Sequence, residues 1–235
     1  MCRCSIDCGD TINFNHTDEH YVKIFFDNDK IKTSIKSYKF LLRYGFNVAK
    51  IIRCKIGTYV SYYVMKKADG KSIRNIITEH PEYALWAGYA VGSEVKKITT
   101  INLSKTTDTH ELFGYLKRYI SMDDLVMFRN KCKYLCYQHG DPNIDNIFID
   151  LENDNKITFI DYDMFKYSNK PINSPAYEYV RFEYSALRNK SVLLPEKNLL
   201  ELVHGFKEGY THYFFSEEEE QILHKWWKAI LRITS

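Results

Sequence analysis

The sequence contains no apolar run that approaches the ~20 residues of a membrane-spanning helix, so we expect no membrane partner. Its formal net charge is only +3 over 235 residues, which is too small to indicate binding to nucleic acid or to an acidic membrane surface. The segment 1–5 lacks the apolar core of a secretory signal. These absences favour a cytoplasmic location, and the sequence indicates no particular oligomeric state.

Paired cysteine motifs are missing as well. The chain has six cysteines, but no C-x-x-C or histidine pair joins Cys2, Cys4 and Cys8 into a metal site. We therefore expect reduced thiols. There are no internal repeats and no low-complexity segments. With 45% hydrophobic and 27% charged residues, the composition is that of an ordinary globular protein.

The most informative segment is residues 136–150. It places a short apolar strand before the pattern H-x-D-x-x-x-x-N, formed by His139, Asp141 and Asn146, and a second apolar strand after it. A polar turn and a third strand follow, and this third strand ends at Asp161. A phosphoryl-transfer site needs such a layout: one carboxylate receives a hydroxyl proton, and an amide and a second carboxylate hold Mg²⁺ against the phosphates.

This layout resembles the aminoglycoside phosphotransferase and choline kinase-like family, small-molecule relatives of the protein kinases. Gly140 stands where protein kinases have the Arg of H-R-D, as is typical of the family. The resemblance implies that Asp141 is catalytic, that Asn146 and Asp161 bind the metal, and that His139 holds the catalytic loop in shape. For Asn146 the alternative is a turn cap.

The same resemblance implies an α+β, bilobal, protein-kinase-like fold. We expect a small β-rich N-terminal lobe with one helix, residues 1–65, that binds the nucleotide. A larger and mainly helical C-terminal lobe, residues 66–235, would carry catalysis and the substrate.

Lys23 lies inside the β-rich run 21–26, where a charge is costly unless it has a partner or a role. The family carries the lysine that contacts the nucleotide phosphates on this strand, and Lys23 matches it. The alternative is a lysine on the solvent face of an edge strand. The segment 65–72 resembles the hinge of the family, where backbone groups near Met65 would hydrogen-bond the nucleotide base.

Two features depart from the family pattern. Its phosphate-contacting lysine usually pairs with a glutamate on the next helix, but residues 32–39 of that expected helix contain no acid. Lys23 is therefore expected to pair elsewhere, with Asp161 as one candidate. The glycine-rich phosphate loop is reduced to Gly9.

Hydrophobic periodicity predicts the remaining elements. The expected strands are 11–15, 21–26, 46–52 and 61–65, and the expected helices are 33–44, 84–98, 111–120, 123–135, 178–188 and 198–213. The expected core includes Trp86, Tyr89 and Val95, with Trp226 and Trp227 as packing anchors. Ser216 and Glu219 form a capping-box pattern at the start of a last helix.

We therefore predict an ATP-dependent phosphotransferase that uses ATP or GTP with Mg²⁺. Its acceptor would be a hydroxyl of an aminoglycoside-like antibiotic or of a related small alcohol or amino sugar, which would imply a role in antibiotic resistance. Cationic acceptors need acids, and Glu178, Glu183 and the run 217–220 are candidates by position.

Two alternatives remain open. The missing helix glutamate and the thin glycine loop favour a nucleotide-binding protein with little or no catalytic activity. A metal phosphoesterase would use His139, Asp141 and Asp161, but it leaves Asn146 and Lys23 without a role.

Overall fold

The structure is a computed structural model that describes residues 4–7, 11–15, 17–101, 104–105, 120–132, 134–162, 174–210 and 215–234. The chain divides into two compact units. The first comprises Met1–Ser72 and Asn146–Tyr167, and the second comprises Ile73–Asp145 and Ser168–Ser235. The expected lobe boundary at residues 65 and 66 stays a prediction. Gly9 and residues 111–119 of the expected helix 111–120 lie outside the described residues.

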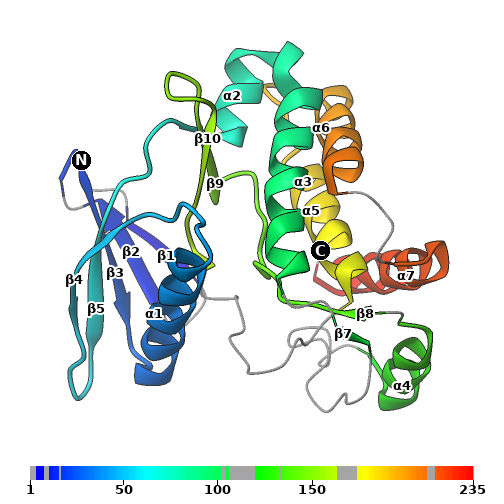
Figure 1. Ribbon diagram of the computed structural model, residues 1–235, viewed down its shortest axis with the longest axis horizontal. Coiled ribbons are helices and arrows are strands. Elements are labelled where there is room, and N and C mark those ends of the chain that lie inside the picture. Colours follow the sequence, from blue (N-terminus) through cyan, green and yellow to red (C-terminus); the bar gives the residue numbers. More distant parts are fainter. Residues whose placement is uncertain are drawn as a thin grey trace. The chain divides into compact units, whose positions relative to one another are not determined.

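The first unit is built on a five-stranded antiparallel sheet with the order β1-β2-β3-β5-β4. Its strands are β1 (Cys4–Asp7), β2 (Thr11–Asn15), β3 (His20–Phe25), β4 (Ile51–Lys55) and β5 (Ser61–Lys66). Helix α1 (Asn28–Arg43) contacts β3 and β5 (Figure 1). The core cluster of this unit is formed by Phe25, Ile31, Ala49, Tyr63 and Met65.

Most of the strands expected in this unit are confirmed, with two differences. Residues 4–7 were not among the expected strands, but they form β1, which pairs with β2. The expected strand 46–52 starts later, at Ile51, and Val48 instead forms an isolated bridge with Phe159.

Helix α1 begins five residues before the expected start at residue 33. Asp27 is the N-cap, and its carboxylate accepts the Asp29 backbone N–H at 2.8 Å. Such a cap satisfies one of the amide groups that a helix leaves without a partner at its first turn. The cap therefore starts the helix at Asn28, before the position that the apolar periodicity predicted.

A second, three-stranded sheet of the first unit has the order β10-β9-β6. Its strands are β6 (Lys71–Ser72), β9 (Ile147–Asp150) and β10 (Lys156–Phe159). The antiparallel hairpin β9–β10 turns through Asp154 and Asn155, whose φ angles are 54° and 55°. Both residue types tolerate this left-handed backbone.

The second unit is mainly helical. Its elements are α2 (Ile73–Glu79), the short 3-10 helix η1 (Pro81–Tyr83), α3 (Ala84–Thr100), β7 (Ser104–Lys105), α4 (Met122–Lys131), β8 (Tyr134–Leu135), α5 (Pro175–Leu187), α6 (Glu196–Tyr210) and α7 (Glu217–Thr234). The expected helix 123–135 is too long, because its last two residues form β8 and pair with β7. Within the described residues, no helix is both long and apolar enough to span a membrane.

Helices α3 and α6 pack with unusually close backbones, side by side in Figure 1. A Cβ atom at Gly88 would lie 2.0 Å from the Leu202 carbonyl oxygen, and one at Gly92 would lie 2.3 Å from that of Phe206. On α6, Gly205 and Gly209 approach the α3 backbone equally closely. Two G-x-x-x-G patterns thus form a contact that we call the glycine seam.

The glycine seam corrects the expected core of α3. Small residues occupy its inner face, so the large ones lie beside it: Tyr89 is 53% exposed, Trp86 is half-buried, and Val95 is buried as expected.

The capping box of α7 is confirmed. The Ser216 backbone N–H donates to Glu219 Oε2 at 2.8 Å, and the Glu219 N–H donates to Ser216 Oγ at 3.2 Å. Trp226 and Trp227 are buried, as expected of packing anchors.

Candidate active-site residues

Lys23 is buried on β3, with 5% of its surface exposed. Its Nζ lies 2.7 Å from Asp161 Oδ1, which confirms the pairing expected from the absence of an acid in residues 32–39. The one acid of α1, Asp29, instead lies near Lys32 at the exposed start of the helix. Removing an ammonium group from water is expensive, and the carboxylate partner offsets that cost. The alternative of a solvent-facing lysine is therefore wrong.

Asp161 has a φ of 53°, in the left-handed region that non-glycine residues seldom adopt. Such backbone strain gathers at functional sites, where the surrounding structure holds it in place. Here the Ile160 N–H donates to the Asn146 carbonyl at 2.9 Å. Since Phe159 pairs with Ile147 in the hairpin β9–β10, Asn146 and Asp161 lie at the same end of that hairpin.

These two side chains fit the donor set that Mg²⁺ takes. A carboxylate and an amide oxygen are hard ligands, and Mg²⁺ is usually held by one or two carboxylates together with waters and phosphate oxygens. The first unit therefore gathers the expected phosphate-binding lysine and both expected metal ligands.

Met65 lies at the end of the central strand β5, and its side chain is part of the core. The following amides are already bonded: the Lys66 N–H donates to the Lys50 carbonyl, and the Lys67 N–H donates to the Glu19 carbonyl, both at 2.8 Å. A backbone contact between this hinge and a nucleotide base stays a prediction.

In the second unit, Asp141 forms an ion pair with Arg181 on α5. Arg181 Nη2 lies 2.8 Å from Asp141 Oδ1, and the side chains are 24% and 21% exposed, respectively. Gly140 precedes Asp141 with a φ of 84°, a conformation that an arginine at this position would adopt only with strain. The backbone thus explains why glycine stands at position 140.

Glu178 lies in the first turn of α5 and is fully buried. The Gly140 N–H donates to its two carboxylate oxygens at 3.2 and 3.3 Å. Burial raises the pKa of Glu178 to about 8, against the Gly140 hydrogen bond, which lowers it, and with the negative charge of Asp141, which raises it further. The expectation that Glu178 contacts a cationic acceptor is corrected, because a fully buried carboxylate that holds the loop backbone has no surface to offer.

His139 is fully buried in the same loop, as suits the structural role expected of it. Neighbouring Gln138 is also buried, and its Nε2 donates to the Ser174 carbonyl at 2.7 Å.

Most of the other acids expected to recognise a cation already have partners in the second unit. Glu183 lies 3.5 Å from His224 Nε2, and Glu220 lies 2.7 Å from Lys207 Nζ. Glu219 is buried in the capping box, and Glu218 pairs with Lys131. The capping interpretation of the run 217–220 is the one that these contacts support.

Sequence reasoning missed two arginines. Arg74 binds both oxygens of Asp145, at 2.6 and 2.7 Å, and so ties α2 to the loop that contains Asp141 and Asn146. Arg181 was missed because no motif in the neighbouring sequence indicates that it contacts Asp141. Its one signal is its spacing of three residues from Glu178, which places both on one face of a helix.

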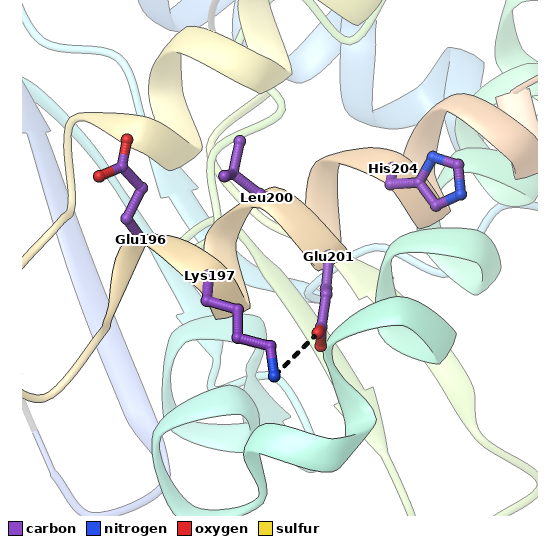
Figure 2. A pocket seen from close by; sticks show the side chains of 5 residues that line it. All are labelled: Glu196, Lys197, Leu200, Glu201 and His204. Carbon is purple, nitrogen blue, oxygen red and sulfur yellow. Dashed lines mark ion pairs between the residues drawn. The ribbon is translucent and has the colours of Figure 1, made fainter.

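Surface hollows occur among the described residues. One, of about 530 Å³, is lined by residues of α6, and Figure 2 shows the ion pair of Lys197 and Glu201 along this helix. Its charged groups come from one exposed helix face and do not converge, so it has no features of a site. Another, of about 680 Å³, lies between α5 and α7, and Glu183 and His224 are among its lining residues.

No known family model matches this sequence, and no curated protein matches it. Solved structures do match its fold. The aminoglycoside phosphotransferase APH(3'')-Id from Streptomyces rimosus has 12% identity and a TM-score of 0.64, over 97% of this chain and 92% of that one. Its complex with ADP and streptomycin has 12% identity and a TM-score of 0.63, over 93% and 90%.

A ternary complex of APH(2'')-IIa with streptomycin and ATP has 12% identity and a TM-score of 0.60, over 99% of this chain and 85% of that one. At such identities the likeness establishes the fold. The chain has the α+β, protein-kinase-like fold of the aminoglycoside phosphotransferases, as the resemblance implied.

Proposed function

We propose that this protein is a small-molecule kinase. It transfers the γ-phosphoryl group of ATP or GTP to a hydroxyl group of an aminoglycoside-like antibiotic or of a related small alcohol or amino sugar. The observation that carries the proposal is the 2.7 Å pair between buried Lys23 and Asp161, 138 residues apart in sequence. The fold supports the same chemistry, since the Streptomyces rimosus enzyme is solved with ADP and streptomycin.

Each proposed site residue has a distinct task. Lys23 binds the phosphates of the nucleotide, and the backbone near Met65 binds its base. Asn146 and Asp161 would hold Mg²⁺, which neutralises charge on the phosphate oxygens when bound. Asp141 orients the acceptor hydroxyl and receives its proton; because such transition states need little early proton removal, it works mainly by positioning.

For the acceptor subsite we propose a single residue. Among the acids expected to meet a cationic acceptor, Glu183 lines the hollow between α5 and α7. We propose it as a contact for an acceptor amine. The acceptor is a small molecule in this proposal, and no nucleic acid takes part.

A coupled assay of ADP release tests the proposal, with Mg-ATP and Mg-GTP against pooled aminoglycosides, other antibiotics, choline and amino sugars. Asp141→Asn serves as the blank. Asp154→Asn is the matched control, since Asp154 is exposed in a turn whose φ of 54° suits asparagine. We expect acceptor-dependent release from the wild type and Asp154→Asn, and none from Asp141→Asn. Equal rates in all three proteins would refute the role of Asp141.

A nucleotide-binding protein without catalysis is the second candidate. One observation favours it: the sequence of α1 offers no glutamate to Lys23, which pairs with the proposed metal ligand Asp161 instead. In that case Mg-ATP raises the melting temperature, yet no acceptor in the panel stimulates ADP release.

A further inference from the structure

Residues 138–141 of the catalytic loop follow one face of α5. Gln138 donates to the carbonyl of Ser174, the N-cap of the helix, and the Gly140 N–H donates to Glu178. The third contact is the ion pair of Asp141 with Arg181. Helix positions 174, 178 and 181 are spaced by four and three residues and therefore share a face. The three contacts follow the same order along the loop and along the helix, so this face of α5 holds residues 138–141.

The side chain of Arg181 makes two contacts that restrict it, one with Trp227 and one with Asp141. Its guanidinium group lies 5.0 Å from the centre of the Trp227 ring, and Trp227 is 3% exposed on α7. Stacking on a buried indole favours one orientation of the guanidinium plane. Its Nη2 then reaches Asp141 at 2.8 Å. The charge-assisted hydrogen bond thus starts from a side chain with little freedom to move.

We propose that Arg181 is a positioning residue, which fixes the Asp141 carboxylate in the orientation that receives the acceptor hydroxyl. This inference rests on the proposed function. An aspartate that follows a glycine in a loop can rotate about its side-chain bonds, and a misplacement of about 1 Å at a reacting group can lower the rate about 100-fold. Because Arg181 is itself held against Trp227, its ion pair with Asp141 restricts the rotation of the Asp141 side chain.

The test compares Arg181→Ala with Arg188→Ala, a matched control at the exposed end of the same helix. In acceptor-dependent ADP release, Arg181→Ala is expected to lower kcat about 10- to 100-fold and to leave the KM for the nucleotide unchanged. Added ethylguanidine, far below denaturing concentrations, is expected to restore part of kcat, because it can fill the space over Trp227 and bond to Asp141. Arg188→Ala is expected to behave as the wild type.

An unchanged kcat in Arg181→Ala would overturn the inference. So would a parallel rise in nucleotide KM or a loss of kcat that ethylguanidine does not restore, because a purely structural arginine would give those results.

A second measurement does not depend on turnover. Equilibrium unfolding of wild type, Arg181→Gln, Asp141→Asn and the double variant forms a cycle, in which the double variant is expected to be less destabilised than the two single changes added together. Additive changes would overturn the pairing on which the inference depends. A wild type that turns over no acceptor would refute the proposed function, and the cycle would then decide by itself whether Arg181 holds Asp141.

Discussion

The glycine seam makes Gly92→Ala a sharp test of the packing of the second unit. A Cβ atom at this position would meet the Phe206 carbonyl oxygen at 2.3 Å, whereas ordinary contacts begin near 3.4 Å. The helices would have to separate by about 1 Å, and overpacking of this kind costs about 1–3 kcal/mol. Helix propensity acts in the opposite direction, since alanine is better than glycine by about 1 kcal/mol in a helix interior. We expect a net loss of about 2 kcal/mol, because separation also opens the neighbouring contacts of the seam.

Tryptophan fluorescence is the right assay, because all three tryptophans, Trp86, Trp226 and Trp227, lie in the second unit together with α3 and α6. In a protein of this size, 2 kcal/mol corresponds to a fall of about 4–8 °C in melting temperature. Thr100→Ala, at the exposed end of α3, is the control and should cause no such loss. A Gly92→Ala protein as stable as the wild type, or more stable, would refute the close approach of the two helices.

The pH dependence of folding tests Glu178, whose buried carboxyl has a pKa of about 8, against an ordinary value of 4.5. Between these two pH values the folded state holds a proton that the unfolded state has released. The contribution of Glu178 to the free energy of unfolding is therefore fully present below pH 4.5 and is lost as the pH rises through 8. The slope of this loss is up to about 1.4 kcal/mol per pH unit. Glu178→Gln keeps an acceptor for the Gly140 N–H and should flatten this slope in urea unfolding at pH 6 to 9; parallel curves would contradict the assignment. In the first unit, Lys23→Met should weaken Mg-ATP binding about 10- to 100-fold in calorimetric titration, as expected when a charge-assisted contact is lost. Lys39→Met, at an exposed position of α1, should not, and equal affinities for both variants would remove Lys23 from the nucleotide site.

The family resemblance implied the fold, and local patterns in the sequence predicted many of its helices and strands. The strand of Lys23 and the capping box of Ser216 and Glu219 were found because alternation and a four-residue motif act over a few neighbouring residues. Asp161 was named as one candidate partner for Lys23, because a cation in an apolar strand needs an anion and the expected helix contained no acid. The glycine seam was missed because a G-x-x-x-G pattern in one helix does not indicate which distant helix it approaches.

Long-range contacts explain the rest of what was missed. Glu178 was expected at a cationic substrate by its position alone, and only the fold shows that it meets the Gly140 amide. Arg181 and Arg74 join residues 40 and 71 positions away, and no spacing rule predicts such pairs. The polar contacts that hold the loop around Asp141 therefore depend on the packing of α2 and α5, which the hydrophobic pattern alone did not describe.

The most direct test of the central claim follows a labelled γ-phosphoryl group from Mg-ATP into a small molecule. If the protein is a small-molecule kinase, a labelled organic phosphate forms with the wild type and with Asp154→Asn, in the presence of an accepted hydroxyl compound, and none forms with Asp141→Asn. Label that appears only as inorganic phosphate, or a product formed equally by Asp141→Asn, would contradict the proposed kinase activity and the role of Asp141.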